Sequence, residues 1–314
     1  MPSEPYLFRL GERLSQGLVG ISPDRREKHR RFFLGRQNPD GGFRGRDTES
    51  DLYYTSFAVR GLALLGALQS PECAAIARYL ASRTDMHVSV VDLVSWLYCA
   101  LMVQLHGGVD VLAQAPADWP DRLASLLESF RTSDGGYAKT HDGAAGSTYH
   151  TFLVALCYEL IGRQAPEPER LRRFVFDRQR ADGGFVEIGP MQRSGTNPTA
   201  AAVALLQMLG AVDDAVRDDV RGFLKDVRSG EGGFQANTRV PFADSLSTFT
   251  GLLTALDLGL TDTFDPAELQ QFLSTLEFPD GGFRGATWDT VADVEYSFYA
   301  LGVMGLAGRM KEEG

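Results

Sequence analysis

The chain has 314 residues, of which 44% are hydrophobic and 23% charged, as in a globular protein with a large core. The formal net charge of -10 argues against a nucleic-acid-binding protein, which needs clustered lysine and arginine. No run of about 18 apolar residues and no signal-peptide core occur, so we expect a cytoplasmic protein without a transmembrane segment.

The first predicted element is a helix at residues 4–17, and six helical hairpins follow it along the chain. In each hairpin the first helix is amphipathic, whereas the second is apolar on nearly all sides, as buried helices are. The second helices end near a glycine, which is a signal for a helix C-terminus. The hairpins span residues 24–66, 71–107, 116–162, 166–210, 213–260 and 265–307.

A short motif joins the two helices in five of the six hairpins: an acidic residue, two glycines and an aromatic residue. The segment PDGGFRG at 39–45 returns unchanged at 279–285, and SDGGYAK, ADGGFVE and GEGGFQA are looser copies. Paired glycines let the chain turn through positive φ values without a steric penalty. The motif therefore predicts structural turns, and neither repeated catalytic sites nor a phosphate-binding loop.

The last apolar helix, YSFYALGVMGLAG, is as apolar as the earlier ones. An open solenoid would need a terminal repeat with a polar face. We therefore predict that the last repeat packs on the first. The expected fold is an all-α, α/α toroid in one domain over residues 1–314, with six inner and six outer helices.

The pattern Q-x-x-D-G-G-F, followed by a helix that begins D-L-x-Y-T or D-x-x-x-S, resembles the prenyltransferase and squalene-cyclase repeat. The resemblance covers residues 24–307 and is strongest to the β subunit of protein prenyltransferases, notably the Rab geranylgeranyl type. It implies an apolar central funnel for an isoprenoid chain. The β subunits work with an α subunit, but neither such a partner nor self-association can be predicted from this sequence.

The β subunits hold one zinc ion through an Asp-x-Cys pair and a histidine. The resemblance places these ligands at Asp244, Leu246 and Tyr296. Because neither leucine nor neutral tyrosine replaces a cysteine or histidine ligand, we predict that the thiol-activating zinc is absent. Mg²⁺ remains as a cofactor that could accompany a diphosphate.

The prenyl diphosphate site implied by the resemblance also departs from the family pattern. The family's histidine falls at Ser194, with Arg193 beside it, and Arg239 lies near the family's basic pair. Guanidinium groups bind phosphate through two hydrogen bonds at once. Arg193, Ser194 and Arg239 are therefore predicted to contact a prenyl diphosphate.

Acidic residues gather at the predicted starts of the second helices. They are Glu49, Asp51, Asp244, Asp289, Asp293 and Glu295. Helix N-capping explains such positions, and binding of diphosphate through Mg²⁺ or general acid catalysis is the alternative. Asp92 differs because it lies within an apolar helix, either as a paired core group or as an acid that faces a cavity. We take Asp244, Asp293, Asp92 and Tyr296 as catalytic candidates.

Aromatic residues recur on the second helices. Most of them are core residues, but rings that face the lumen would line an apolar tunnel and could stabilise a carbocation. His150 is either a lone ligand or base, or a hydrogen-bonded core histidine. The further candidate substrate-binding residues are the acid Asp51, the aromatic residues Tyr54, Trp96, Phe249 and Tyr299, and His150.

Three functions are compatible with these observations. The first is an enzyme that transfers or ionises a prenyl diphosphate without the usual zinc. The second is a class II terpene cyclase-like enzyme, in which an acid protonates a double bond, although the Asp-x-Asp-Asp motif of those enzymes is not found. The third is a toroid that binds a lipid or a protein partner without catalysis.

Overall fold

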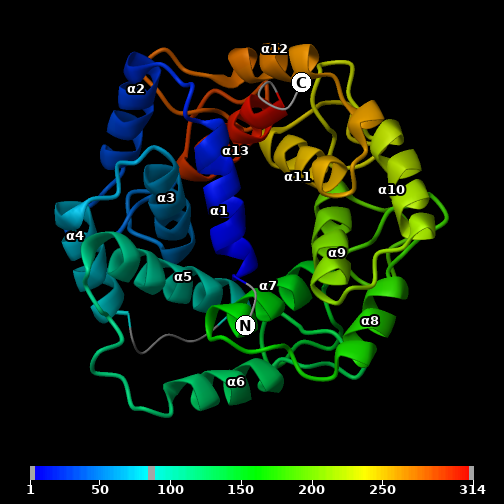
Figure 1. Ribbon diagram of the computed structural model, residues 1–314, viewed down its shortest axis with the longest axis horizontal. Helices are drawn as coiled ribbons and strands as arrows, with labels where there is room; N and C mark the ends of the chain where they lie inside the picture. The colour runs from blue at the N-terminus through cyan, green and yellow to red at the C-terminus, as the bar shows by residue number, and fades with distance from the viewer. Residues whose placement is uncertain (1–3, 84–88, 311–314) are drawn as a thin grey trace. The chain divides into compact units, whose positions relative to one another are not determined.

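The computed structural model describes residues 4–83 and 89–310. Within these ranges the chain forms thirteen α-helices, one short 3-10 helix and isolated β-bridges (Figure 1). It divides into two compact units, residues 1–120 with 276–314 (unit 1) and residues 121–275 (unit 2). The prediction of one domain over residues 1–314 stays a prediction.

The helices form an N-terminal helix and six successive pairs, close to the predicted repeat ranges. Unit 1 holds α1 (Tyr6–Gly17), α2 (Pro23–Leu34), α3 (Leu52–Leu64), α4 (Ser70–Ala81), α5 (Val90–Gly107) and α13 (Val294–Met310). Unit 2 holds α7 (Thr148–Leu160), α8 (Pro168–Phe176), α9 (Thr196–Met208), α10 (Asp214–Asp226), α11 (Ser245–Asp257) and η1 (Thr261–Thr263). The unit boundaries fall within α6 (Trp119–Ser129) and α12 (Pro266–Leu276).

The paired glycines are confirmed as structural turns. In all five copies the first glycine has a positive φ, between 84° and 101°. A Cβ on the second glycine would lie only 2.3 to 2.8 Å from an aromatic ring of the following outer helix. These rings belong to Tyr79, Phe174, Phe223, Phe272 and Phe32. Each turn therefore packs against the next repeat as closely as a residue without a side chain allows.

A hydroxyl group on the second helix fixes each turn. The backbone N–H of the motif's aromatic residue donates to this hydroxyl over 2.8 to 3.0 Å. The five acceptors are Thr55, Thr151, Thr199, Thr248 and Ser297. Because the aromatic residues are buried, water does not reach these N–H groups, and the hydroxyl groups supply the acceptors that they need.

The last repeat contacts the first within unit 1, as predicted. The turn at Gly281 and Gly282 lies against Lys28 and Phe32 of α2. Glu277 forms ion pairs with Arg25 and Lys28 at 2.6 and 2.7 Å. We call Glu277, Arg25, Lys28 and His29 the closing cluster.

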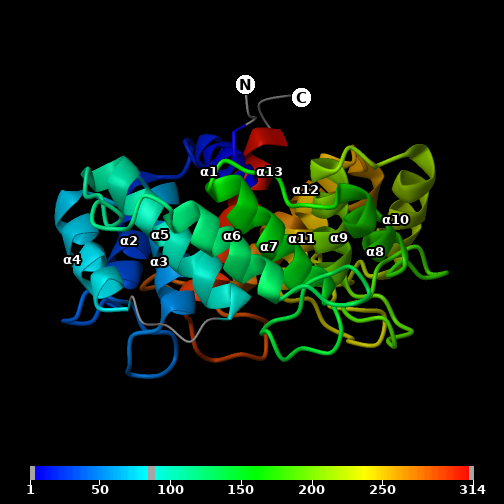
Figure 2. The same cartoon turned by 90° about the horizontal axis from the view of Figure 1, so that it is seen from below.

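The N-terminal helix α1 packs on α13 through glycines. Gly17 of α1 faces Gly305 and Gly308 of α13 so closely that an added Cβ at Gly17 or Gly308 would overlap backbone oxygen. Figure 2 shows α1 at the opposite end of α3 and α13 from the loops 44–50 and 286–293. The N-terminal helix is therefore an integral part of unit 1.

Among the described residues, α5 alone is long and apolar enough, by length and composition, to cross a membrane. Half of this helix is buried, and it packs against α3 and α4. The same length and composition are found in core helices of soluble proteins, and this packing gives α5 that role.

Candidate functional site

The first group of interacting polar residues lies at the N-terminus of α13 in unit 1. Tyr53 of α3 donates its hydroxyl hydrogen bond to Oε1 of Glu295 at 2.5 Å. Arg46 binds Asp293 at 2.8 Å and Asp289 at 2.5 Å, and its guanidinium lies 5.4 Å from the centre of the Tyr296 ring. The loops that precede α3 and α13 thus meet here, although the residues that pair are 243 and 247 positions apart in the sequence. We call Glu295, Tyr53, Asp293, Arg46 and Asp289 the acid cluster.

The two carboxylates on α13 differ in their partners. Burial raises the pKa of Glu295 to about 7; the Tyr53 hydrogen bond opposes this rise and the Asp293 charge adds to it. Asp293 instead is ion-paired with Arg46 and caps α13 by accepting from the N–H of Tyr296. Glu295 can therefore carry a proton at neutral pH beside a paired carboxylate. Its second oxygen, Oε2, accepts no hydrogen bond within residues 4–83 and 89–310.

Aromatic rings adjoin the acid cluster. The Phe57 ring lies 4.8 Å from Tyr53, 5.5 Å from Phe298 and 5.2 Å from Tyr299, measured between ring centres. Tyr54 packs edge-on against Tyr53 and closely against Gly45. The acid thus has an apolar, aromatic neighbourhood in which a developing positive charge would meet ring faces.

The predicted catalytic residues fall into two groups. Asp293 and Tyr296 belong to or touch the acid cluster. Asp244 lies in unit 2, where burial raises its pKa although it accepts hydrogen bonds from the backbone and side chain of Ser247. Asp92 lies in the first turn of α5 and accepts from the Ser89 hydroxyl at 2.7 Å.

N-capping, the simplest interpretation of the acids, is confirmed for three of them. Asp51, Asp244 and Asp293 each accept the N–H three residues further on, at 3.1, 2.7 and 3.0 Å. N-capping alone therefore accounts for Asp51 and Asp244, without a catalytic role. Asp293 differs because Arg46 binds it in addition.

The predicted zinc ligands offer an incomplete donor set, since Leu246 has no donor atom. Among the described ranges, no three His, Cys, Asp or Glu side chains come together as metal ligands. The residues thus do not fit the zinc site of the resemblance. That the protein works without zinc stays a prediction.

The predicted diphosphate-binding residues lie on loops of unit 2. Arg193 donates to the Thr238 hydroxyl at 2.8 Å, which joins two successive loops. Arg239 is exposed, and its guanidinium has no partner in the described part of the chain. The Ser194 hydroxyl is buried and donates to Asp182 at 2.6 Å, so it stabilises its own turn.

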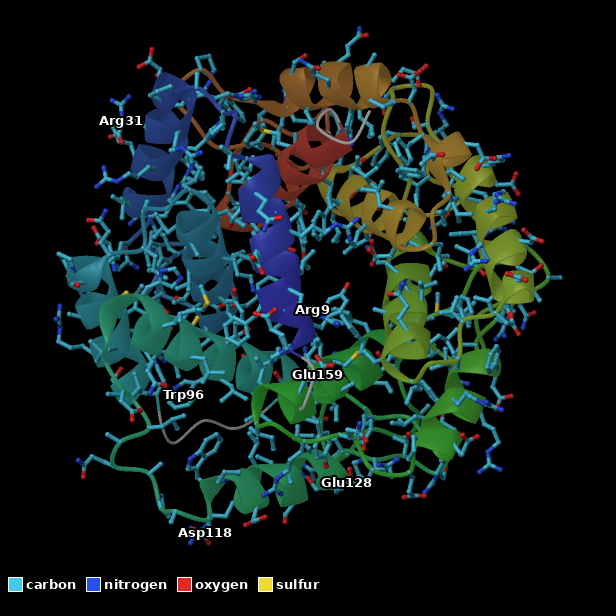
Figure 3. All side chains as sticks on the ribbon, viewed as in Figure 1. Arg9, Arg31, Trp96, Asp118, Glu128 and Glu159 are labelled. Atoms are coloured by element: carbon cyan, nitrogen blue, oxygen red, sulfur yellow. The ribbon has the colours of Figure 1, made fainter. Side chains whose placement is uncertain are left out.

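The remaining substrate-binding candidates have partners in the protein. The Nδ1 atom of His150 lies 2.7 Å from the Ser147 hydroxyl, and burial lowers its pKa to about 4, with the Lys139 charge adding to this. Trp96, labelled in Figure 3, donates its indole N–H to the Leu80 carbonyl at 3.1 Å. Phe249 is buried on α11. A hydrogen-bonded core histidine is therefore the reading that the His150 contacts support.

Glu295 is among the predicted helix-start acids and Tyr53 among the recurring aromatic residues, but the sequence selects neither as a site residue, and it gives no signal for Arg46 or Arg60. The signal that could have selected Glu295 is its spacing from Asp293, two residues away on one helix start. Two neighbouring carboxylates with different environments are a common acid–base arrangement.

Comparisons with known proteins agree with this architecture. A family model described as "Prenyltransferase alpha-alpha toroid domain" matches residues 12–186 and 84–313. Among solved structures, Candida albicans protein geranylgeranyltransferase-I complexed with GGPP is 17% identical, covers 91% of this chain and 92% of its own, and has a TM-score of 0.65. No curated protein matches.

Two further structures share the fold. A variant of the type II terpene cyclase MstE from Scytonema, in complex with the product merosterolic acid A, is 15% identical, with coverage of 97% and 99% and a TM-score of 0.64. An alpha-1,6-mannanase of Salegentibacter is 13% identical, with coverage of 96% and 99% and a TM-score of 0.59. The family match confirms the predicted α/α toroid class, and these likenesses concern the fold alone.

Proposed function

The chain belongs to the prenyltransferase alpha-alpha toroid domain family, and on that premise we propose that it is an isoprenoid enzyme in which Glu295 protonates a carbon–carbon double bond. One observation carries the proposal: Glu295 has a pKa of about 7 and is hydrogen-bonded by Tyr53 at 2.5 Å among aromatic rings. This favours the class II cyclase-like reaction over the other two functions.

The reaction follows from the two oxygens of Glu295. Tyr53 donates to Oε1, which leaves Oε2 to carry the acidic proton. When the double bond takes this proton, its electron pair forms the new C–H bond, and a carbocation and the Glu295 carboxylate result. Tyr53 stabilises this carboxylate, and the rings of Phe57, Phe298 and Tyr299 stabilise the cation. An internal double bond then closes on the cation, a proton is lost to water, and Glu295 is reprotonated, so substrate and product are isomers.

The test compares the wild type with Glu295→Gln. Both proteins are incubated with farnesyl and geranylgeranyl diphosphate, and products are followed by mass spectrometry. We expect an isomer that keeps its diphosphate, formed at least about a hundredfold more slowly by Glu295→Gln, since general acid catalysis contributes about 10²–10⁴. Equal turnover by the two proteins would contradict the role of Glu295.

A second candidate function rests on the arginines of unit 2. Arg193, held by Thr238, and Arg239, which has no partner among the described residues, would bind a prenyl diphosphate that is then transferred or ionised without zinc. Mg²⁺, when bound, would neutralise diphosphate charge. In the same experiment, this function predicts release of pyrophosphate together with an alcohol, a hydrocarbon or an adduct. The Arg193→Met variant should lose this release. Retained ligand without any product would leave a binding toroid.

A further inference from the structure

An arginine without an acidic partner lies on α3 of unit 1. Arg60 is half-buried, and its Nε atom is buried without a hydrogen-bond partner. Within residues 4–83 and 89–310 its guanidinium forms neither a hydrogen bond nor an ion pair. Its Nε–H is thus a buried donor of a permanently charged group without an acceptor among these residues.

Three aromatic rings surround this guanidinium. Its central carbon lies 4.7 Å from the ring centre of Tyr98, 5.5 Å from Phe57 and 5.9 Å from Phe298. The rings come from α5, α3 and α13, and each is at most 5% exposed. Burial raises the pKa of Tyr98 to about 12 even though Arg60 opposes this rise, so Tyr98 stays neutral and supplies no counter-charge.

Two other arginines of unit 1 have carboxylate partners. Arg46 binds Asp289 and Asp293, and Arg25 binds Glu277. Ring faces attract a cation, but they do not satisfy N–H donors, and a partly desolvated guanidinium without an acceptor is unfavourable. A ligand that supplies acceptor oxygens would remove this deficit.

We propose that Arg60 binds the anionic oxygen group, a carboxylate or a phosphate, of an otherwise apolar ligand. The planar fork of the guanidinium fits two oxygens of either group. This inference rests on the proposed function for the isoprenoid nature of the ligand, and it adds Arg60 as the residue that binds the ligand's anionic head group.

The position of Arg60 relative to the acid cluster determines the distance between the head group of such a ligand and the double bond that is protonated. Arg60 lies seven residues after Tyr53 on α3, which is about 10 Å along the helix axis. Phe57 lies between them and touches Tyr53. The head group and the double bond that Glu295 protonates would therefore be at separate places along one chain.

Binding of three matched compounds tests the proposal: farnesoic acid, farnesyl monophosphate and farnesol. Dissociation constants are measured for the wild type, Arg60→Met, Arg60→Lys, the competing-site variant Arg239→Met and the control Arg173→Met, which removes an exposed arginine of α8 in unit 2. We expect Arg60→Met to weaken at least one anionic compound about ten- to a hundredfold and to leave farnesol unchanged. Arg60→Lys keeps the charge and should lose less.

The arms of this experiment separate the alternatives. The anionic compound that binds the wild type more tightly and depends more on Arg60 identifies the head group as carboxylate or phosphate. An equal loss for farnesol in Arg60→Met would show a packing role and overturn the proposal, as would dependence on Arg239 in place of Arg60, or no binding of any compound by the wild type. Arg60-dependent binding with unaltered turnover in Glu295→Gln would instead overturn only the proposed function.

Discussion

At the scale of single residues, the acid cluster separates two carboxylates that are two positions apart on α13. Arg46 compensates the charge of Asp293 directly, whereas Glu295 faces Tyr53 and no cation within hydrogen-bonding distance in the described chain. One carboxylate is thus suited to remain an ion and the other to deliver a proton. The pH dependence of the protein should report this division.

The first prediction concerns activity. Because protonated Glu295 is the acid, kcat/KM should be constant at low pH and fall about tenfold per pH unit above its pKa of about 7. The Tyr53 hydrogen bond lowers the pKa of Glu295, so Tyr53→Phe should move the fall to higher pH and reduce the plateau rate. A profile of Tyr53→Phe that coincides with the wild type would rule out this coupling.

The second prediction concerns stability at the same residue. The folded pKa of Glu295 is raised, so the folded protein binds more protons between about pH 4.5 and 7, and the free energy of unfolding falls as pH rises through this window. Glu295→Gln removes this pH-dependent decrease in the free energy of unfolding. The variant should therefore be more stable than the wild type at pH 8 by up to about 3 kcal/mol. Urea unfolding at pH 5 and pH 8 measures the difference, which should shrink at pH 5.

At the scale of the helix pair, the glycine turn transmits contacts from one repeat to the next. Gly184 has a Cα so near the Phe223 ring that an added Cβ would lie 2.7 Å from it. Gly230, close to the next turn, has open space where its Cβ would be. The two glycines therefore form a matched pair for a mutational test.

The third prediction uses this pair. Gly184→Ala should lower the free energy of unfolding by about 1–3 kcal/mol through overpacking, whereas Gly230→Ala should change it by less than about 0.5 kcal/mol or stabilise the protein slightly. Both values come from urea denaturation. Similar losses in the two variants would mean that the contact with Phe223 is not what requires glycine at position 184.

The repeated elements were predictable, and the acid cluster was not. Helix pairs and turns could be predicted because each depends on residues within one repeat, and the motif occurs five times. Tyr53 and Glu295 are 242 positions apart, so their contact depends on how the last repeat meets the first. The lack of a partner for Arg60 is equally a property of three helices together, and no local pattern contains it.

At the scale of the whole chain, the closing cluster connects the last repeat to the first within unit 1. Burial raises the pKa of Glu277, but hydrogen bonds from His29, Arg25 and Lys28 outweigh it and hold the pKa well below its usual range. Burial lowers the pKa of His29, whose Nδ1 accepts the Gly282 N–H at 3.1 Å and must be unprotonated to do so.

The fourth prediction follows from these two shifts. Both groups bind fewer protons in the folded state, so the free energy of unfolding should fall with decreasing pH, first below about 6.5 as His29 gains a proton on unfolding, then below about 4.5 for Glu277. Glu277→Gln should cost about 3 kcal/mol at pH 7 and flatten the lower part of this curve. An unchanged slope below pH 4.5 would assign the acid sensitivity to other carboxylates.

The two identical heptapeptides of this chain pack on different helices. The copy at 39–45 lies against α4, and the copy at 279–285 lies against α2. The residue two positions before each copy differs: Gln37 is neutral, and Glu277 is an acid that meets the basic face of α2. One charge, two positions before the motif, thus distinguishes the turn that packs on α2 from the identical turn that packs on α4.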